Sequence, residues 1–175
     1  MFNSFCKQTW CYERFRISWY KNYQTLMHQV FVSIGSNINP KENIKIAKGF
    51  LNNLFDCKFS SLYESIAEGF EGNDFINCVV TFETDLILFE LQRNLKQIEL
   101  KMGRTESQKG MSNRIIDLDI ILYGDQVIKE DNFYLPSKDI EEYLFVLEPL
   151  AEIAGDKKHP VSKQTFLSLL SKLKS

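Results

Sequence analysis

Histidine and cysteine are scarce in this chain, and their scarcity argues against several kinds of site. There are two histidines and four cysteines among 175 residues. The cysteines form no CxxC pair and no cluster with histidine at zinc-binding spacing: they are Cys6, Cys11, Cys57 and Cys78. We therefore expect neither a zinc site nor a histidine-based triad, and we interpret the cysteines as free thiols of a reduced, cytoplasmic protein.

Long apolar runs, strong net charge and glycine-rich phosphate loops are also missing. No stretch approaches the roughly 20 apolar residues of a membrane span, and a net charge of −2 argues against nucleic-acid binding through bulk positive charge. The chain contains neither GxxxxGKS/T nor GxGxxG, so neither a P-loop nor a Rossmann turn is expected to hold a nucleotide. We expect no membrane partner and no nucleic-acid partner.

The composition is that of one folded domain preceded by a different segment. Hydrophobic residues make up 44% and charged residues 25% of the chain, which is typical of a globular protein. Residues 1–26 are rich in aromatics and lack the apolar centre of a secretory signal, and a regular strand pattern begins directly after Met27. We expect an N-terminal extension over 1–26 and one domain over 27–175. A targeting or membrane-touching role for the extension is the alternative.

The order of predicted elements defines a fold class. Alternating and helical spacing predict the order β-α-β-β-α-β, over residues 29–34, 40–55, 58–65, 76–84, 88–102 and 113–124. A short strand pair or extended piece follows, and then helical spacing over 139–154 and 163–173. We therefore predict an α+β fold with a ferredoxin-like βαββαβ core, a largely antiparallel sheet and additional C-terminal strands and helices. Two helices should cover one face, which leaves the other for a ligand or the C-terminal helices.

Start and stop signals frame the two core helices. Asn39, Pro40 and Glu42 predict an N-cap, a proline at the first helical position and an acid at the third. Gly103 predicts the end of the second helix.

Two acidic residues stand in the most apolar predicted strand, NRIIDLDIILYG (113–124). Alternation places Asp117 and Asp119 on one face, and the even-numbered apolar residues from 116 to 122 on the other. Carboxylates at i and i+2, with Cα atoms about 7 Å apart, can converge on one point, where a divalent cation keeps both ionised. Oxygen ligands favour Mg²⁺, which takes its other ligands from water and phosphates. The spacing suggests a nucleotide-phosphate site; a solvated sheet face, or pairing with Arg114, is the alternative.

The loop before this strand is basic. Residues 101–114 carry four cations and one acid: Lys101, Arg104, Lys109, Arg114 and Glu106. Guanidinium groups match phosphate oxygens, so a basic loop leading into an acidic strand suggests a phosphate clamp beside a metal pair. A solvated run of charges is the alternative. Gly103 and Gly110 are candidate hinges of a lid over 104–113.

Five blocks of the sequence together resemble one enzyme family. They are FVSIGSN (31–37), DFINCVVTFET (74–84), LQRNLKQIELKMGR (91–104), RIIDLDIILYG (114–124) and FVLEPLAEIA (145–154). In this order they are similar to 6-hydroxymethyl-7,8-dihydropterin pyrophosphokinase of folate biosynthesis, over about residues 28–173. The resemblance implies transfer of the β,γ-pyrophosphate of ATP to the pterin hydroxymethyl oxygen, with two Mg²⁺ ions and release of AMP. The implied partners are these small molecules, and we expect a monomer.

The resemblance implies roles for individual residues. Asp117 and Asp119 match the metal-binding aspartates, and Arg104 and Arg114 match phosphate-handling arginines; these four form the implied catalytic set. The implied nucleotide contacts add Gln97 and Glu99, with Lys109 and Lys138 as candidate cations. The implied pterin contacts are Ser65, Phe75, Asn77, Met111 and Phe145. Core packing of the phenylalanines, and helix-surface polarity for Gln97 and Glu99, are the alternatives.

Several positions depart from the family pattern, and four of them bear most on catalysis. Glu106 and Tyr143 stand for arginines, Ser137 for a histidine and Met111 for a tryptophan. Loss of charge stabilisation in a transition state can slow an enzyme by orders of magnitude. We therefore expect a slow or divergent pyrophosphokinase. The alternatives are a degenerate, non-catalytic relative that binds a pterin or a protein partner, and an unrelated ferredoxin-like module.

Overall fold

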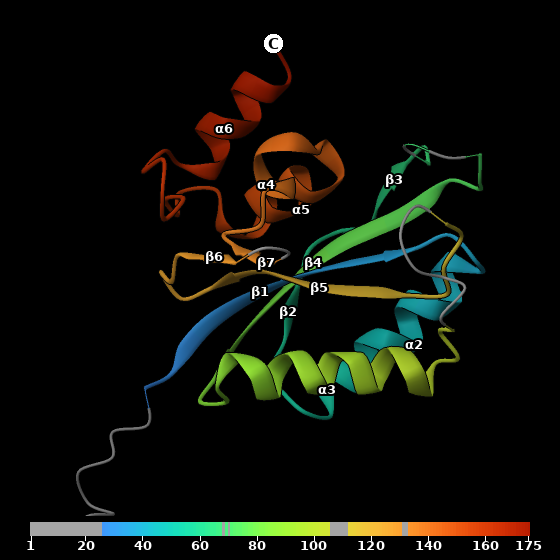
Figure 1. Cartoon of the computed structure of the whole chain (residues 1–175). Helices are drawn as coiled ribbons and strands as arrows, with labels where there is room; N and C mark the ends of the chain where they lie inside the picture. The colour runs from blue at the N-terminus through green and yellow to red at the C-terminus, as the bar shows by residue number, and fades with distance from the viewer. Residues whose placement is uncertain (1–25, 68, 70, 106–111, 131–132) are drawn as a thin grey trace, which may run out of the picture.

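A computed structural model describes residues 26–67, 69, 71–105, 112–130 and 133–175. The chain forms three layers, with an antiparallel sheet of long and short strands between two groups of helices (Figure 1). Helices α2 (Pro40–Asn52) and α3 (Leu88–Lys101) cover one face of the sheet. Helices α4 (Asp139–Glu142), α5 (Leu144–Ala154) and α6 (Phe166–Leu173) lie over the other. The predicted α+β class and the predicted use of both faces are confirmed.

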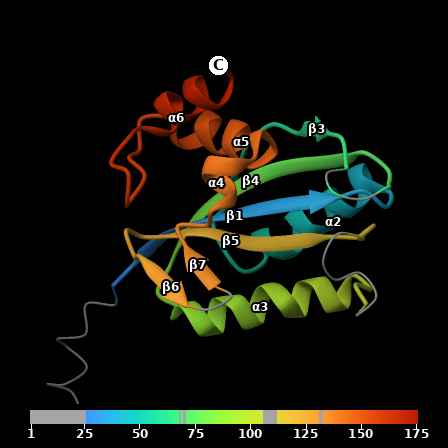
Figure 2. The same ribbon diagram turned by 45° about the horizontal axis from the view of Figure 1, so that its top comes forward.

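The main sheet has five strands, with β1 (His28–Ser36) at its centre. β1 pairs antiparallel with β4 (Phe75–Thr84) on one side and with β5 (Asp117–Tyr123) on the other. The short strands β2 (Lys58–Phe59) and β3 (Tyr63–Ser65) both pair antiparallel with β4. β6 (Ile128–Glu130) and β7 (Phe133–Leu135) form a separate hairpin, which lies beside β5 at the edge of the main sheet (Figure 2). The predicted antiparallel sheet and the short C-terminal strand pair are therefore both observed.

Two hydrophobic cores lie on the two faces of the sheet. The first packs α2 and α3 against the apolar residues of β1, β4 and β5, including Val32, Val80 and Leu118. The second packs α4, α5 and α6 against Phe31, Val79 and their neighbours. Because both faces of β1 and β4 are covered, these strands are apolar on both sides along much of their length.

A β-bulge corrects the predicted alternation of the acidic strand. The register of β5 against β1 shifts between Phe31 and Val32, where Ile121 is the extra residue. Leu122 therefore packs in the second core with Phe31, not on the face of Leu118 and Ile120 as predicted. The aspartates precede the bulge and keep the predicted alternation.

The predicted strand over 58–65 is interrupted. The Ser60 hydroxyl accepts a hydrogen bond from the Val79 N–H (2.9 Å), and Ser61 donates its N–H and hydroxyl to Glu152 of α5 (3.0–3.1 Å). These side-chain bonds lie in the gap between β2 and β3, where the regular pairing with β4 is interrupted. The prediction of one continuous strand was therefore wrong.

Three helix predictions also need correction. Pro40 is at the first turn of α2 as predicted, but Asn39 has a left-handed backbone (φ 43°) and makes no side-chain cap. The helix ends at Asn52 instead of residue 55. The helix predicted over 139–154 divides at Tyr143, whose extended backbone (φ −125°, ψ 126°) separates α4 from α5.

Candidate active site

Two cavities of similar size meet at the acidic strand. The first, of about 630 Å³, is lined by β1, β4, β5, the loop after β3 and the start of α5. The second, of about 600 Å³, lies between α3, β5 and the segment from β7 to α4. Asp119 and Asp139 line both cavities. The carboxylate pair predicted from the sequence therefore stands where two binding spaces join.

The register of the sheet leaves room in front of the carboxylates. Asp119 lies opposite Ser33 of β1, and Asp117 lies opposite Gly35. Gly35 also lies opposite Asn77 of β4, and a Cβ atom at Gly35 would come within 3.1 Å of the Asn77 Oδ1. Small residues on the central strand thus create the floor of the first cavity.

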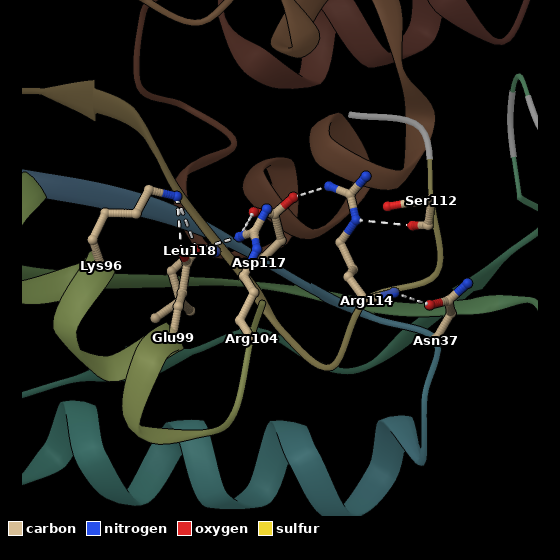
Figure 3. Close-up of polar contacts among 8 residues, drawn as sticks. All are labelled: Asn37, Lys96, Glu99, Arg104, Ser112, Arg114, Asp117 and Leu118. Carbon is tan, nitrogen blue, oxygen red and sulfur yellow. Dashed lines mark hydrogen bonds and ion pairs between the residues drawn. The ribbon is translucent and has the colours of Figure 1, made fainter. Parts of the chain in front are cut away.

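Asp117 is held by two arginines. Its Oδ1 accepts from the Nη1 of Arg104, and its Oδ2 accepts from the Nη1 of Arg114, both at short range (Figure 3). All three side chains are largely buried, with 13–17% of their surface exposed. An ionised Asp117 can therefore stand in an apolar strand, because two guanidinium groups compensate its charge. A metal ion at Asp117 would therefore require the arginines to turn toward another anion.

Asp119 has a different environment. Its side chain is exposed and lines both cavities. Partial desolvation by the neighbouring protein atoms, together with the charge of Asp117, raises the pKa of Asp119 to about 7, although Lys96 and Arg104 act in the opposite direction. A carboxylate of this kind gains stability from a cation at its side. The oxygen-only pair thus fits Mg²⁺, with remaining ligands from water or phosphate. The described residues contain no group of three or more histidine, cysteine or acidic side chains at metal-binding distance.

Glu99 is buried, with 2% of its surface exposed, so its interpretation as helix-surface polarity was wrong. Its Oε1 accepts from Arg104 Nη1 (2.6 Å) and from the Leu118 N–H (2.8 Å). Its Oε2 accepts from Lys96 Nζ (2.8 Å) (Figure 3). Burial opposes the charge of Arg104, but the carboxylates of Asp117 and Glu99 outweigh it and raise the pKa of the guanidinium. Glu99 therefore fixes Arg104 against the strand that carries the aspartates.

Asn37 fixes the second arginine, and sequence reasoning missed it. Its side chain is buried and accepts from the Arg114 N–H (2.7 Å). It also donates to the Asn73 carbonyl (3.1 Å) and to Asn113 Oδ1 (2.7 Å). One amide thereby joins the loop after β1, the loop before β4 and the segment that leads into β5. Its signals in the sequence were its place directly after a buried strand and at the end of the FVSIGSN block.

The predicted pterin-side residues come together in the first cavity. Ser65, Phe75, Asn77 and Phe145 all line it, with Arg114 and both aspartates. Asn77 is buried and donates from Nδ2 to the Ser65 hydroxyl (2.9 Å). Tyr143 stacks on Phe145 with ring centroids 5.0 Å apart. A flat, polar-edged molecule would find aromatic walls and a fixed amide here.

The second cavity receives fewer of the predicted residues. Lys138 lines it with Tyr134, whose ring centroid is 3.7 Å from the lysine Nζ. Gln97 is exposed on α3 and is absent from the lining of both cavities, whereas Gln92 and Lys96 line the second. Asp139, which also escaped prediction, bonds the Ser137 hydroxyl (3.1 Å). Lys109, Met111, Glu106 and most of the predicted lid lie outside the described residues.

A family model and curated relatives of this chain all point to the same enzyme family. The sequence model of 7,8-dihydro-6-hydroxymethylpterin-pyrophosphokinase matches residues 31–155. A 2-amino-4-hydroxy-6-hydroxymethyldihydropteridine pyrophosphokinase of Haemophilus influenzae is 33% identical over 142 residues, which is 78% of this chain and 88% of that protein. The protein of the same name from Synechocystis is 35% identical over 150 residues, 83% of this chain and 76% of that protein.

Longer proteins share the same region. The folic acid synthesis protein fol1 of Pneumocystis carinii is 34% identical over 82% of this chain, which spans 20% of that protein. The crystal structure of wild-type Plasmodium falciparum HPPK-DHPS with pterin and p-hydroxybenzoate superposes with a TM-score of 0.66 at 14% identity. That superposition covers 87% of this chain and 44% of the other, and it supports the fold alone.

Fold and comparisons together define the class of protein, an ATP-dependent diphosphotransferase on a ferredoxin-like α+β scaffold. The chain belongs to the 7,8-dihydro-6-hydroxymethylpterin-pyrophosphokinase family of folate biosynthesis. The sequence-based predictions of family, fold, enzyme class and general function are thereby confirmed. No comparison favours the non-catalytic alternative. None of the described helices is long and apolar enough to cross a membrane.

Proposed function

We propose that this chain transfers the β,γ-pyrophosphate of ATP to the hydroxyl of 6-hydroxymethyl-7,8-dihydropterin, giving AMP and the pterin diphosphate. The observation that carries the proposal is the position of Asp119, which lines both cavities. A direct transfer between two substrates needs both reacting ends at one place. The pterin would occupy the first cavity and the nucleotide the second, with the reacting oxygens meeting at the carboxylate pair.

The first cavity can select and orient a pterin. The ring would lie against Phe75 and Phe145, and the buried amide of Asn77 would pair with its polar edge. The hydrogen bond from Asn77 to Ser65 fixes the rotamer of that amide before any ligand enters. A preorganised amide discriminates strongly against ligands that lack the matching donor and acceptor groups.

Asp117 and Asp119 would hold two Mg²⁺ ions. When bound, such ions neutralise phosphate charge and polarise the reacting oxygens of an in-line displacement. Arg104 and Arg114 now engage both oxygens of Asp117. We infer that these arginines turn to the phosphates when Asp117 takes up a cation, since each guanidinium then exchanges one anion for another. The hydrogen bond from Arg104 to Glu99 would remain while the guanidinium exchanges Asp117 for a phosphate.

The remaining parts of the proposal concern the setting of the enzyme. Cys57 and Cys78 are free thiols, and burial raises the pKa of both to about 11. Unreactive free thiols suit a reducing compartment, so we propose a cytoplasmic location. We also propose that the enzyme acts as a monomer.

The test is a direct assay of AMP formation. The full chain is incubated with 6-hydroxymethyl-7,8-dihydropterin, ATP and Mg²⁺, and nucleotides are separated by chromatography. AMP should form in step with the pterin diphosphate, and its formation should cease when the pterin is omitted. Release of ADP in place of AMP, or no nucleotide turnover over many hours, would refute the proposed reaction.

A further inference from the structure

Two lysines line separate walls of the second cavity. Lys96 comes from α3, and Lys138 comes from the segment between β7 and α4. Among the described residues that line this cavity, these two are the cations, and they are accompanied by Asp119 and Asp139. Both lysines are exposed, with 56% of the Lys96 side chain accessible. Each can therefore turn toward a ligand in the cavity.

Lys96 is held near the cavity by a partner that does not depend on it. Its Nζ is 2.8 Å from Glu99 Oε2. Glu99 also accepts from Arg104 and from the Leu118 N–H, so its buried carboxylate stays compensated when Lys96 leaves. An ion pair with one exposed partner contributes little to stability. Lys96 is thus a tethered cation that is available to an incoming anion.

Lys138 has an equally weak hold on its present position. Its Nζ lies 3.7 Å from the centroid of the Tyr134 ring, and a cation–π contact at an exposed site is weak. A phosphate oxygen would attract the ammonium group more strongly than the ring does. Release of Lys138 would also free the face of Tyr134, a residue that lines the same cavity.

We propose that Lys96 and Lys138 together grip the polyphosphate of the nucleotide, one from each wall of the second cavity. In this proposal Lys96 binds the polyphosphate, and Lys138 binds the same polyphosphate from the other wall. The identity of the nucleotide rests on the proposed function, but the chemistry required of the ligand is only that of a linear polyphosphate. Two ammonium groups on separate walls can contact such a chain at separate points along its length.

Calorimetric titration of the full chain tests the pair. The probes are inorganic tripolyphosphate with Mg²⁺, and α,β-methylene ATP with Mg²⁺, whose replaced bond is the one that the proposed reaction breaks. Lys96→Gln and Lys138→Gln should each weaken both probes about tenfold, the value of one charge-assisted hydrogen bond, and the double variant should weaken them about a hundredfold. The salt dependence of binding should become shallower in each variant. Lys45→Gln, on the exposed surface of α2 and absent from the lining of both cavities, is the matched control and should bind as the unmodified chain does.

Two further variants separate the charge from the structure. Lys96→Arg and Lys138→Arg keep the positive charge and should retain most of the affinity. If Lys96→Gln and Lys138→Gln bind tripolyphosphate as tightly as Lys45→Gln does, the proposed binding by the two lysines is wrong. The assay of AMP formation is independent of this result: AMP release with unaffected lysine variants overturns the grip alone. Lysine-dependent tripolyphosphate binding without any AMP release overturns the proposed reaction alone.

Discussion

The two cavities that meet at Asp119 are built in different ways. Strands form most of the first, whose polar group Asn77 is buried and already hydrogen-bonded. A helix and a connecting segment form the second, whose lysines are exposed and weakly held. The first is therefore fixed before its ligand arrives, whereas the second must rearrange around its ligand. A rigid heterocycle suits a fixed slot, and a flexible, highly charged chain suits an adjustable one.

The largest expected effect comes from the residue that the two cavities share. Asp119→Asn should reduce AMP formation at least about a thousandfold, because an amide does not hold a divalent cation as a carboxylate does. Initial rates of AMP release measure the effect, and circular dichroism checks that the fold is retained. Asp125→Asn, on the exposed turn after β5, is the control. Near-normal turnover in Asp119→Asn would remove Asp119 from the mechanism.

A change in the fixed cavity should act on one substrate only. Asn77→Ala removes the buried amide, and we expect the KM for the pterin to rise about 30-fold to 100-fold, the effect of about 2–3 kcal/mol. The KM for ATP should change by less than about threefold. Steady-state kinetics with each substrate varied in turn measures both values, with Asn52→Ala at the exposed end of α2 as the control. Equal effects on both substrates would contradict the separation of the two cavities.

A smaller disturbance of the same cavity tests its rigidity. Gly35→Ala places a Cβ atom 3.1 Å from Asn77 Oδ1 and 3.8 Å from Phe75 Cδ1. The amide must then shift by a few tenths of an ångström, and we expect about a tenfold loss in kcat/KM for the pterin. Gly49→Ala, in α2 with nothing near the added Cβ, should retain activity and gain up to about 1 kcal/mol of stability. Unchanged pterin kinetics in Gly35→Ala would show that the slot adapts more than we infer.

The smallest effect concerns the frame of the fixed cavity. Glu152 of α5 accepts hydrogen bonds from Ser61 and from the Tyr63 hydroxyl (2.9 Å), and so ties α5 to the strand that carries Ser65. Slight burial works against ionisation, but these hydrogen bonds lower the pKa of Glu152. The pKa of Glu152 is therefore lower in the folded protein than in the unfolded chain. Ionised Glu152 contributes fully to the free energy of unfolding when the pH is above its unfolded-state pKa, and this contribution is lost as the pH falls through its folded-state pKa.

Glu152→Ala should therefore reduce the free energy of unfolding by about 1 kcal/mol at pH 7. The difference from the unmodified chain should shrink as the pH falls below about 4.5, the ordinary range for glutamate. Urea denaturation at several pH values measures this, and Glu148→Ala, one turn earlier on α5 and paired with Lys174, is the comparison. A difference that stays constant down to pH 3 would exclude ionised Glu152 as its source.

Sequence patterns located most of the fixed cavity and little of the adjustable one. Ser65, Phe75, Asn77 and the two aspartates lie on strands, where alternation and motif order specify which face a residue occupies. Lys96 and Asp139 do not follow from such a pattern, because their approach to Asp119 depends on how α3 and the start of α4 pack beside β5. Sequence analysis named Gln97 as a nucleotide contact, whereas its neighbour Lys96 lines the cavity. Successive side chains on a helix point about 100° apart, so an error of one residue moves the prediction to a different face.

The sequence by itself determined the order of the elements, the antiparallel sheet and the side-by-side carboxylates, because these follow from periodicity and local spacing. It also indicated the family, through the resemblance of five sequence blocks. Only the tertiary structure decided that Arg104 and Arg114 both engage Asp117 and that buried Glu99 and Asn37 hold them. It also decided that Asp119 joins two cavities. These features bring together residues from separate helices, strands and loops, and contacts between distant segments are set by packing, which no local pattern encodes.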